Sequence, residues 1–103
     1  MFLARVIGSV VSTKKDEAMK GRKLVVLRPL LVDEANPAQL RSGANTIVAV
    51  DALGAGLDEV VLFCQGSSAR QASGMKTLPV DAVVVGIVDT GDVLNQKIYP
   101  AKK

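Results

Sequence analysis

Two segments of this chain carry residue types that could do chemistry at close spacing. The first is a flexible Gly-x-Gly turn, Gly54-Ala55-Gly56, and the second is a small-residue turn with one arginine, Gly66-Ser67-Ser68-Ala69-Arg70. Free backbone N–H groups beside an arginine could hold an anion in the second turn. The interpretation we favour is a capped turn whose arginine makes an ion pair between strands or between subunits.

The first turn lacks the features of a nucleotide site. A dinucleotide fingerprint needs a third glycine and a long following helix, whereas the residues from Val60 onward are strand-like. The Gly-Lys-Ser/Thr ending of a phosphate loop is also missing. In the second turn, Arg70 stands where a nucleophile elbow needs its final glycine. We therefore interpret the first turn as a structural connection and find no nucleophile elbow in the second.

The other polar residues form no catalytic or metal-binding set. The chain has no histidine, which removes the Ser-His-Asp and Cys-His nucleophile systems. Adjacent carboxylates on a strand point to opposite faces and make a poor acid–base pair; such pairs occur at 16–17, 33–34 and 58–59. Asp89 and Asp92 could bind a cation in a turn, although surface solubility is the preferred interpretation. We expect no enzyme activity, no metal site and no cofactor.

Length and composition limit the partners. The 103 residues are enough for a single domain, 1–103, with its own core. The only cysteine, Cys64, cannot form an internal disulfide and is expected to be a small buried hydrophobe. The net charge of +3 is scattered, and two phenylalanines and one tyrosine are too few for a stacking groove, so single-stranded nucleic acid fits poorly as a ligand. No targeting segment and no membrane-spanning run stand out, and the expected compartment is the cytoplasm.

The hydrophobic pattern is mostly that of β-strands. We predict strands over 3–11, 23–31, 46–51, 59–64 and 80–89, with a short sixth segment over 93–99. Pro29 indicates an edge or a bulge near the end of the second strand. We also predict a long loop over 32–45 with one helical turn around 38–41. A short helix should begin at Ser67 or Ser68, run to about Ala72 and be closed by Gly74.

Three of these strands are apolar on both faces. They cover residues 23–27, 59–64 and 82–88 and do not alternate. Such strands need cover on both sides, but a small closed barrel covers only the inner face. We infer a homo-oligomer whose subunits cover one another. The alternative is that the long loops fold back over the outer face.

Several short pieces, read in order, match one known pattern. They are Arg5-Val6-Ile7-Gly8 with Val10-Val11 and Thr13-Lys14, Gly21 with Lys23-Leu24, Val48-Ala49-Val50-Asp51, Gly54-Ala55-Gly56 with Glu59-Val60-Val61-Leu62, Gly66-Ser67-Ser68-Ala69-Arg70, Pro79-Val80-Asp81-Ala82 and Gly86-Ile87-Val88-Asp89. On these pieces the chain resembles the bacterial microcompartment vertex proteins, the pentameric shell family with carboxysome and ethanolamine-compartment members. Each piece is weak by itself, and their order along the chain makes the resemblance specific.

The resemblance implies a fold, a function and a set of partners. The implied fold is mainly β, a small five-stranded OB-like barrel with one short helix that assembles as a ring. The implied function is structural: a homopentamer that caps the vertices of an icosahedral shell in the bacterial cytoplasm, beside hexameric shell proteins. No reaction, cofactor, nucleic acid or membrane is implied. The rival interpretation is a small OB-fold module that binds single-stranded nucleic acid or a small anionic ligand.

Within this resemblance, small residues are the candidates for subunit contacts or for the ring axis, because they let two backbones approach closely. The candidates are Gly54, Ala55, Gly56, Gly66, Ser67, Ser68 and Arg70. Arginine can bridge to carbonyls or a carboxylate across an interface. Two features depart from the family: the loop over 32–45 is longer and more polar than expected, and Asp58 stands where members often carry glycine.

Overall fold

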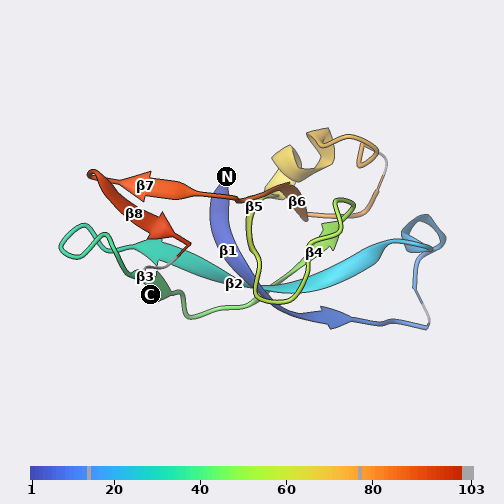
Figure 1. Ribbon diagram of the computed structural model, residues 1–103. Coiled ribbons are helices and arrows are strands. Elements are labelled where there is room, and N and C mark those ends of the chain that lie inside the picture. Colours follow the sequence, from blue (N-terminus) through green and yellow to red (C-terminus); the bar gives the residue numbers. More distant parts are fainter. Residues whose placement is uncertain (14, 77, 101–103) are drawn as a thin grey trace.

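A closed barrel of five strands forms the centre of the molecule (Figure 1). The computed structural model describes residues 1–13, 15–76 and 78–100. The barrel strands are β1 (Phe2–Val10), β2 (Lys23–Val32), β4 (Ile47–Asp51), β5 (Val60–Gln65) and β6 (Ala82–Ile87). They pair in the order β1-β5-β6-β4-β2, and β2 pairs with β1 to close the ring of strands. The β4–β6 pair is parallel and the others are antiparallel. The predicted mainly-β barrel is therefore confirmed.

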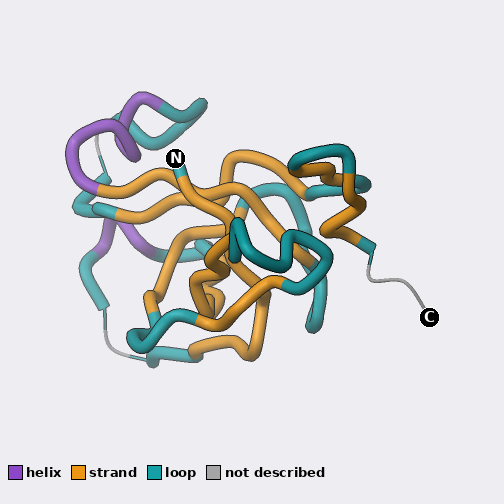
Figure 2. Tube along the Cα trace, turned by 90° about the vertical axis from the view of Figure 1, so that its left-hand side faces the viewer, coloured by secondary structure: helices purple, strands orange, loops and turns teal. Residues whose placement is uncertain are grey.

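Shorter elements extend the barrel at its two ends, so the molecule measures 45 × 24 × 23 Å. Strand β3 (Leu40–Ser42) pairs with β2, and a separate hairpin of β7 (Gly91–Val93) and β8 (Gln96–Tyr99) lies at the same end in Figure 1. The 3-10 helices η1 (Glu17–Met19) and η2 (Gly66–Gln71) lie toward the other end. Viewed after a quarter turn, the strands wrap around the centre, with the helical segments to one side (Figure 2).

The long loop over 32–45 differs from the prediction. The helical turn expected around 38–41 is wrong, because Leu40–Ser42 forms β3 and pairs with β2. Two successive turns reverse the chain instead, with N–H donation from Asn36 to the Asp33 carbonyl and from Gln39 to the Asn36 carbonyl. The side chain of Asp33 also accepts a hydrogen bond from the Ala35 N–H at 3.0 Å. The loop is therefore the connection of a β-hairpin between β2 and β3.

Pro29 lies where β2 changes its second partner. Residues 23–27 of β2 pair with β4, and residues 30–32 pair with β3. Between these two pairings the strand has no ladder on that side, so the missing N–H of proline leaves no bond unmade. Pro29 thus lies at a gap between two ladders and not on an outer edge, because it pairs with Ala4 of β1 and its carbonyl accepts the Gly43 N–H at 2.7 Å.

The C-terminal segment is a hairpin and not the single strand predicted over 93–99. Leu94 and Asn95 form a two-residue turn with φ of 49° and 63° between β7 and β8. Positive φ at both positions is the geometry of a type I′ turn, which usually carries Asn-Gly or Asp-Gly. A leucine in the first position hides that signal in the sequence.

The short helix is also different in detail. It is a 3-10 helix that begins after Gln65, and neither Ser67 nor Ser68 caps it. The Ser68 hydroxyl instead donates to the Gln65 carbonyl at 2.7 Å. The C-cap of this helix is Ala72. Gly74, with φ of 77°, turns the chain two residues later.

The core has two parts, one inside the barrel and one outside it. The inner part contains Ala4, Val6, Val25, Leu27, Ala49, Ala55, Val61, Phe63, Ala82 and Val84. The outer part contains Val50, Ala69, Met75, Leu78, Val80 and Val83, with half-buried Cys64 packed against it. The segment that follows β5 thus covers the outer face of β4 and β6. For this part of the barrel the fold-back alternative holds, and the apolar excess there needs no partner.

Candidate assembly surface

The two turns singled out in the sequence lie at opposite ends of one strand. Gly54–Gly56 precedes β5 and Gly66–Arg70 follows it, and Figure 1 shows the two connections leaving the barrel in different directions. Six residues at the rise of a strand separate the turns by roughly 20 Å. The structure therefore does not bring them together in one subunit.

A buried carboxylate anchors the first turn. The side chain of Asp51, at the end of β4, has no exposed surface. Its Oδ1 accepts the Leu53 N–H at 2.9 Å and its Oδ2 accepts the Ala55 N–H at 2.7 Å. Lys23 Nζ lies 3.5 Å from the same Oδ2 and donates to the Ala55 carbonyl at 2.8 Å. These four residues, Lys23, Asp51, Leu53 and Ala55, are called the Asp51 network below.

The second half of this loop is bonded to β1 and to itself. The Asp58 N–H donates to the Val6 carbonyl at 2.8 Å, and the Val6 N–H donates to the Glu59 carbonyl at 2.9 Å. The Glu59 carboxylate accepts the Gly56 N–H at 2.6 Å, and Arg5 donates to the Asp58 carbonyl at 3.0 Å. The loop over 52–59 is thus held by hydrogen bonds at both of its halves.

The glycine and alanine candidates in this loop play different parts. Gly54 is exposed with φ of 85°, a conformation that favours glycine. A Cβ on Gly56 would come within 3.2 Å of the Glu59 carboxylate. The side chain of Ala55 is buried in the inner core, so it anchors the loop. The residues on either side of Ala55, exposed Gly54 and half-buried Gly56, are the ones that reach solvent.

Asp58 adopts a left-handed conformation, with φ of 70°. This is the position where the resembled family often carries glycine. The local geometry is therefore one that glycine adopts without strain, and aspartate is among the few other residues that tolerate it.

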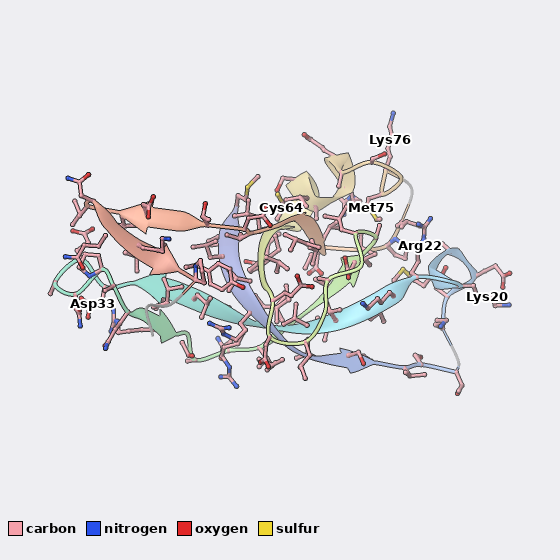
Figure 3. The ribbon with its side chains drawn as sticks, in the orientation of Figure 1. Lys20, Arg22, Asp33, Cys64, Met75 and Lys76 are labelled. Atoms are coloured by element: carbon pink, nitrogen blue, oxygen red, sulfur yellow. The ribbon has the colours of Figure 1, made fainter. Side chains whose placement is uncertain are left out.

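Apolar side chains hold the second turn. Gly66, with φ of 68°, donates its N–H to the Asp81 carbonyl at 2.7 Å. Ala69 is fully buried and packs with Met75 and Leu78 in the outer core. Figure 3 shows Met75 against the barrel and Lys76 directed away from it.

The second turn presents polar groups to solvent. Ser67, Ser68 and Arg70 are exposed. Arg70 makes no ion pair with any residue that the structure describes. The turn thus exposes hydroxyl groups and one guanidinium, while the buried Ala69 holds its backbone against the outer core.

The Asp51 network was not predicted as functional, nor were the exposed leucines Leu53 and Leu57 beside it. A weak signal was present, because an aspartate closes the apolar strand Ile47–Asp51 just before a turn. Periodicity cannot tell whether such a carboxylate faces solvent or the core.

Nothing described in the structure forms a reaction centre. Within residues 1–13, 15–76 and 78–100, no three histidine, cysteine, aspartate or glutamate side chains gather as metal ligands. In the same ranges every buried side-chain nitrogen or oxygen has a hydrogen-bond partner. No buried polar group there is left unsatisfied in a way that would indicate a bound ligand. None of the described helices is both long and apolar enough to cross a bilayer. The fold and the site define a small barrel with two anchored loops and no reaction centre among the described residues, which is the class of a structural building block.

Comparisons with known proteins agree with this class. The family described as ethanolamine utilisation protein EutN/carboxysome matches residues 1–89. The carboxysome shell vertex protein CcmL of Gloeobacter violaceus is 47% identical over 102 residues, which cover 99% of this chain and 96% of the relative. The microcompartment shell vertex protein PduN of Salmonella typhimurium is 48% identical over 90 residues, covering 87% and 97%.

Solved structures give the same result. The structure of Gloeobacter violaceus CcmL aligns with a TM-score of 0.82 at 47% identity and covers 96% of both chains. The GrpN pentameric microcompartment shell protein from Rhodospirillum rubrum aligns with a TM-score of 0.73 at 45% identity, covering 90% of this chain and all of the other. The chain belongs to the EutN/CcmL family of microcompartment shell vertex proteins. The resemblance, the structural and non-enzymatic function and the location in a microcompartment shell are thereby confirmed.

Proposed function

We propose that the chain closes into a homopentamer that occupies the vertices of an icosahedral microcompartment shell and adjoins hexameric shell proteins there. A flat layer of hexagons cannot close, and pentagons supply the curvature that closes it. The observation that carries the proposal is the likeness, at 45% identity, to a relative described as a pentameric microcompartment shell protein.

The two ends of β5 are the proposed contact patches. A closed ring of identical subunits joins two different surfaces of each copy. The loop over 52–59 and the turn over 66–70 lie at opposite ends of one strand and differ in chemistry, which supports this use. Gly54 and Gly56 allow close backbone approach, and Ala55 holds them in place. Gly66, Ser67, Ser68 and Arg70 supply the polar contacts, with Arg70 bridging to carbonyls or a carboxylate of the next copy.

The first test is native mass spectrometry of the purified chain, checked by light scattering. Five chains of 10.8 kDa should appear at about 54 kDa. A hexamer would contradict the vertex role. A monomer at micromolar concentration would overturn the ring and return the small binding barrel to first place, and titration with single-stranded DNA at two salt concentrations would then test that rival.

Arg70→Glu tests the contact patch itself. The charge reversal should weaken the ring while the subunit keeps its fold, because Arg70 is exposed. Lys97→Glu, the same reversal at an exposed site in the C-terminal hairpin, is the matched control. An unchanged oligomer and an unchanged melting curve for Arg70→Glu would reject its role.

The hexameric partner needs a separate experiment. A hexameric shell protein from a microcompartment should form closed, faceted particles when the chain is added and only open sheets or tubes without it. Negative-stain electron microscopy distinguishes these forms. Closed particles in both samples would contradict the vertex function without affecting the pentamer.

A further inference from the structure

Two large apolar side chains stand out from the first contact loop. Leu53 is 51% exposed and Leu57 is 67% exposed, while Ala55 between them is buried. A single exposed leucine on a protein surface is ordinary. Two of them on one short loop are informative here because hydrogen bonds at Leu53, Ala55 and Gly56 hold the backbone that carries them.

The fastening is done by a group that is costly to bury. A carboxylate without exposed surface is unfavourable unless it is paired and hydrogen-bonded. Asp51 meets this requirement with two backbone N–H donors and the ammonium of Lys23, whose side chain is half-exposed. All of its partners except Lys23 lie in the loop, so the carboxylate specifies the conformation of that loop.

We propose that Asp51 and Lys23 are positioning residues for ring assembly, which hold the loop over 52–57 in one conformation so that Leu53 and Leu57 form an apolar contact with the neighbouring copy. This inference rests on the proposed pentamer and adds to it the residues that make and support one side of the contact. A contact that is rigid before binding loses less conformational freedom when the ring closes.

The surroundings of the loop favour an apolar protein surface as its partner. Leu57 lines a groove of about 450 Å³ together with Val6, Ile7 and Val25, and Ile7 adds its own exposed side chain. Lys23 is the one cation among the residues that line this groove, and its ammonium is already bonded to Asp51 and to the Ala55 carbonyl. The groove therefore suits apolar side chains of a second copy better than a free anion.

The contact is tested with Leu57→Ser and a matched control. Leu94→Ser removes a leucine of nearly equal exposure, 66%, from the hairpin turn at the far end of the molecule. Sedimentation velocity over a dilution series gives the dissociation constant of the ring. Leu57→Ser should raise it about tenfold or more, as the loss of a central apolar contact does, and Leu94→Ser should leave it near wild type. Equal effects of the two variants would overturn the contact.

The positioning role is tested with Asp51→Asn, alone and with Leu57→Ser. Asparagine keeps one acceptor for the loop but loses the second acceptor and the charge that pairs with Lys23. If Asp51 acts through the loop, the double variant should dissociate little more than the worse single variant, because both changes remove one contact. Additive effects on the dissociation constant would overturn the positioning role.

Two further measurements keep the outcomes separate. Circular dichroism at concentrations where the ring has dissociated shows whether the Asp51→Asn subunit is folded. If it is not, Lys23→Met takes its place, alone and together with Leu57→Ser. A wild-type chain that is not pentameric contradicts the proposed function itself. A pentameric wild type with an unaffected Leu57→Ser variant contradicts only the inference about the loop.

Discussion

The loops at the two ends of β5 are built in opposite ways. The loop over 52–59 is held from inside by a carboxylate and backbone hydrogen bonds, and it turns leucines outward. The segment over 66–80 is held from inside by Ala69, Met75 and Leu78, and it turns serines and an arginine outward. Length explains the difference. The second segment is long enough to bring its own small core, whereas the first is short, adds only Ala55 to the barrel core and depends mainly on polar bonds.

This inversion suits a ring of identical subunits. If one loop of each copy meets a different surface of the next, the two surfaces need not be alike, and apolar and polar patches can be separated within one subunit. The comparison makes specific predictions, because each loop should fail for a different physical reason.

The largest effect is expected where the anchor is apolar. Met75→Ala should reduce the free energy of unfolding by about 3 kcal/mol, because methionine is fully buried there and the outer core would be left with a cavity. Urea denaturation at one fixed chain concentration measures it, since assembly also stabilises the fold. Lys76→Ala, at the exposed neighbouring position, should change it by less than about 0.5 kcal/mol. Similar losses in both variants would mean that the segment has no core of its own.

The next effect separates the two patches by their response to salt. Arg70→Glu should weaken the ring about tenfold at low ionic strength and much less at about 0.5 M salt, because screening reduces charge interactions across an interface. Leu57→Ser should weaken it to the same extent at both salt concentrations. Dissociation constants from sedimentation at the two ionic strengths give the answer. Parallel salt responses in the two variants would remove the chemical contrast between the patches.

A smaller effect is expected at the glycine that begins the second segment. Gly66→Ala should lower the free energy of unfolding by about 1 kcal/mol, because alanine is strained at a φ of 68°. No atom lies within 4 Å of the added Cβ, so the cost comes from the backbone alone. Gly8→Ala is the control, since that Cβ also meets nothing and its backbone is not left-handed. Thermal melting should show a lower Tm for the first variant and little change for the second.

The smallest effect has the opposite sign and concerns the first loop. Asp58→Gly should raise the free energy of unfolding by about 0.5 kcal/mol. Glycine removes the strain of the left-handed backbone at this position, and this gain should exceed the entropic cost of ordering a residue that is more flexible in the unfolded chain. The hydrogen bonds of Asp58 to Val6 and Arg5 use backbone atoms and survive the change. A lower Tm in the same assay would show that the aspartate side chain has a role in the loop.

Much of the fold could be predicted because the strands are long apolar runs. The five barrel strands were expected within about two residues of their observed bounds, since burial on a closed barrel leaves a strong signal in sequence. The elements that were missed are short or carry unusual turn residues. Strand β3 has three residues and depends on its partner β2, and the β7–β8 turn places leucine where a glycine-like conformation is needed.

The sequence by itself determined the class of this protein. Missing histidine, scattered charge and the ordered glycine-rich pieces indicated a structural protein of one family, because these are properties of residue types and their order. The tertiary structure alone decided which of these side chains are buried and which face solvent. It buries Asp51, packs Ala69, Met75 and Leu78 against the outer face of the barrel and leaves Leu53 and Leu57 in solvent. Burial depends on contacts between residues distant in the chain, and local patterns do not contain that information.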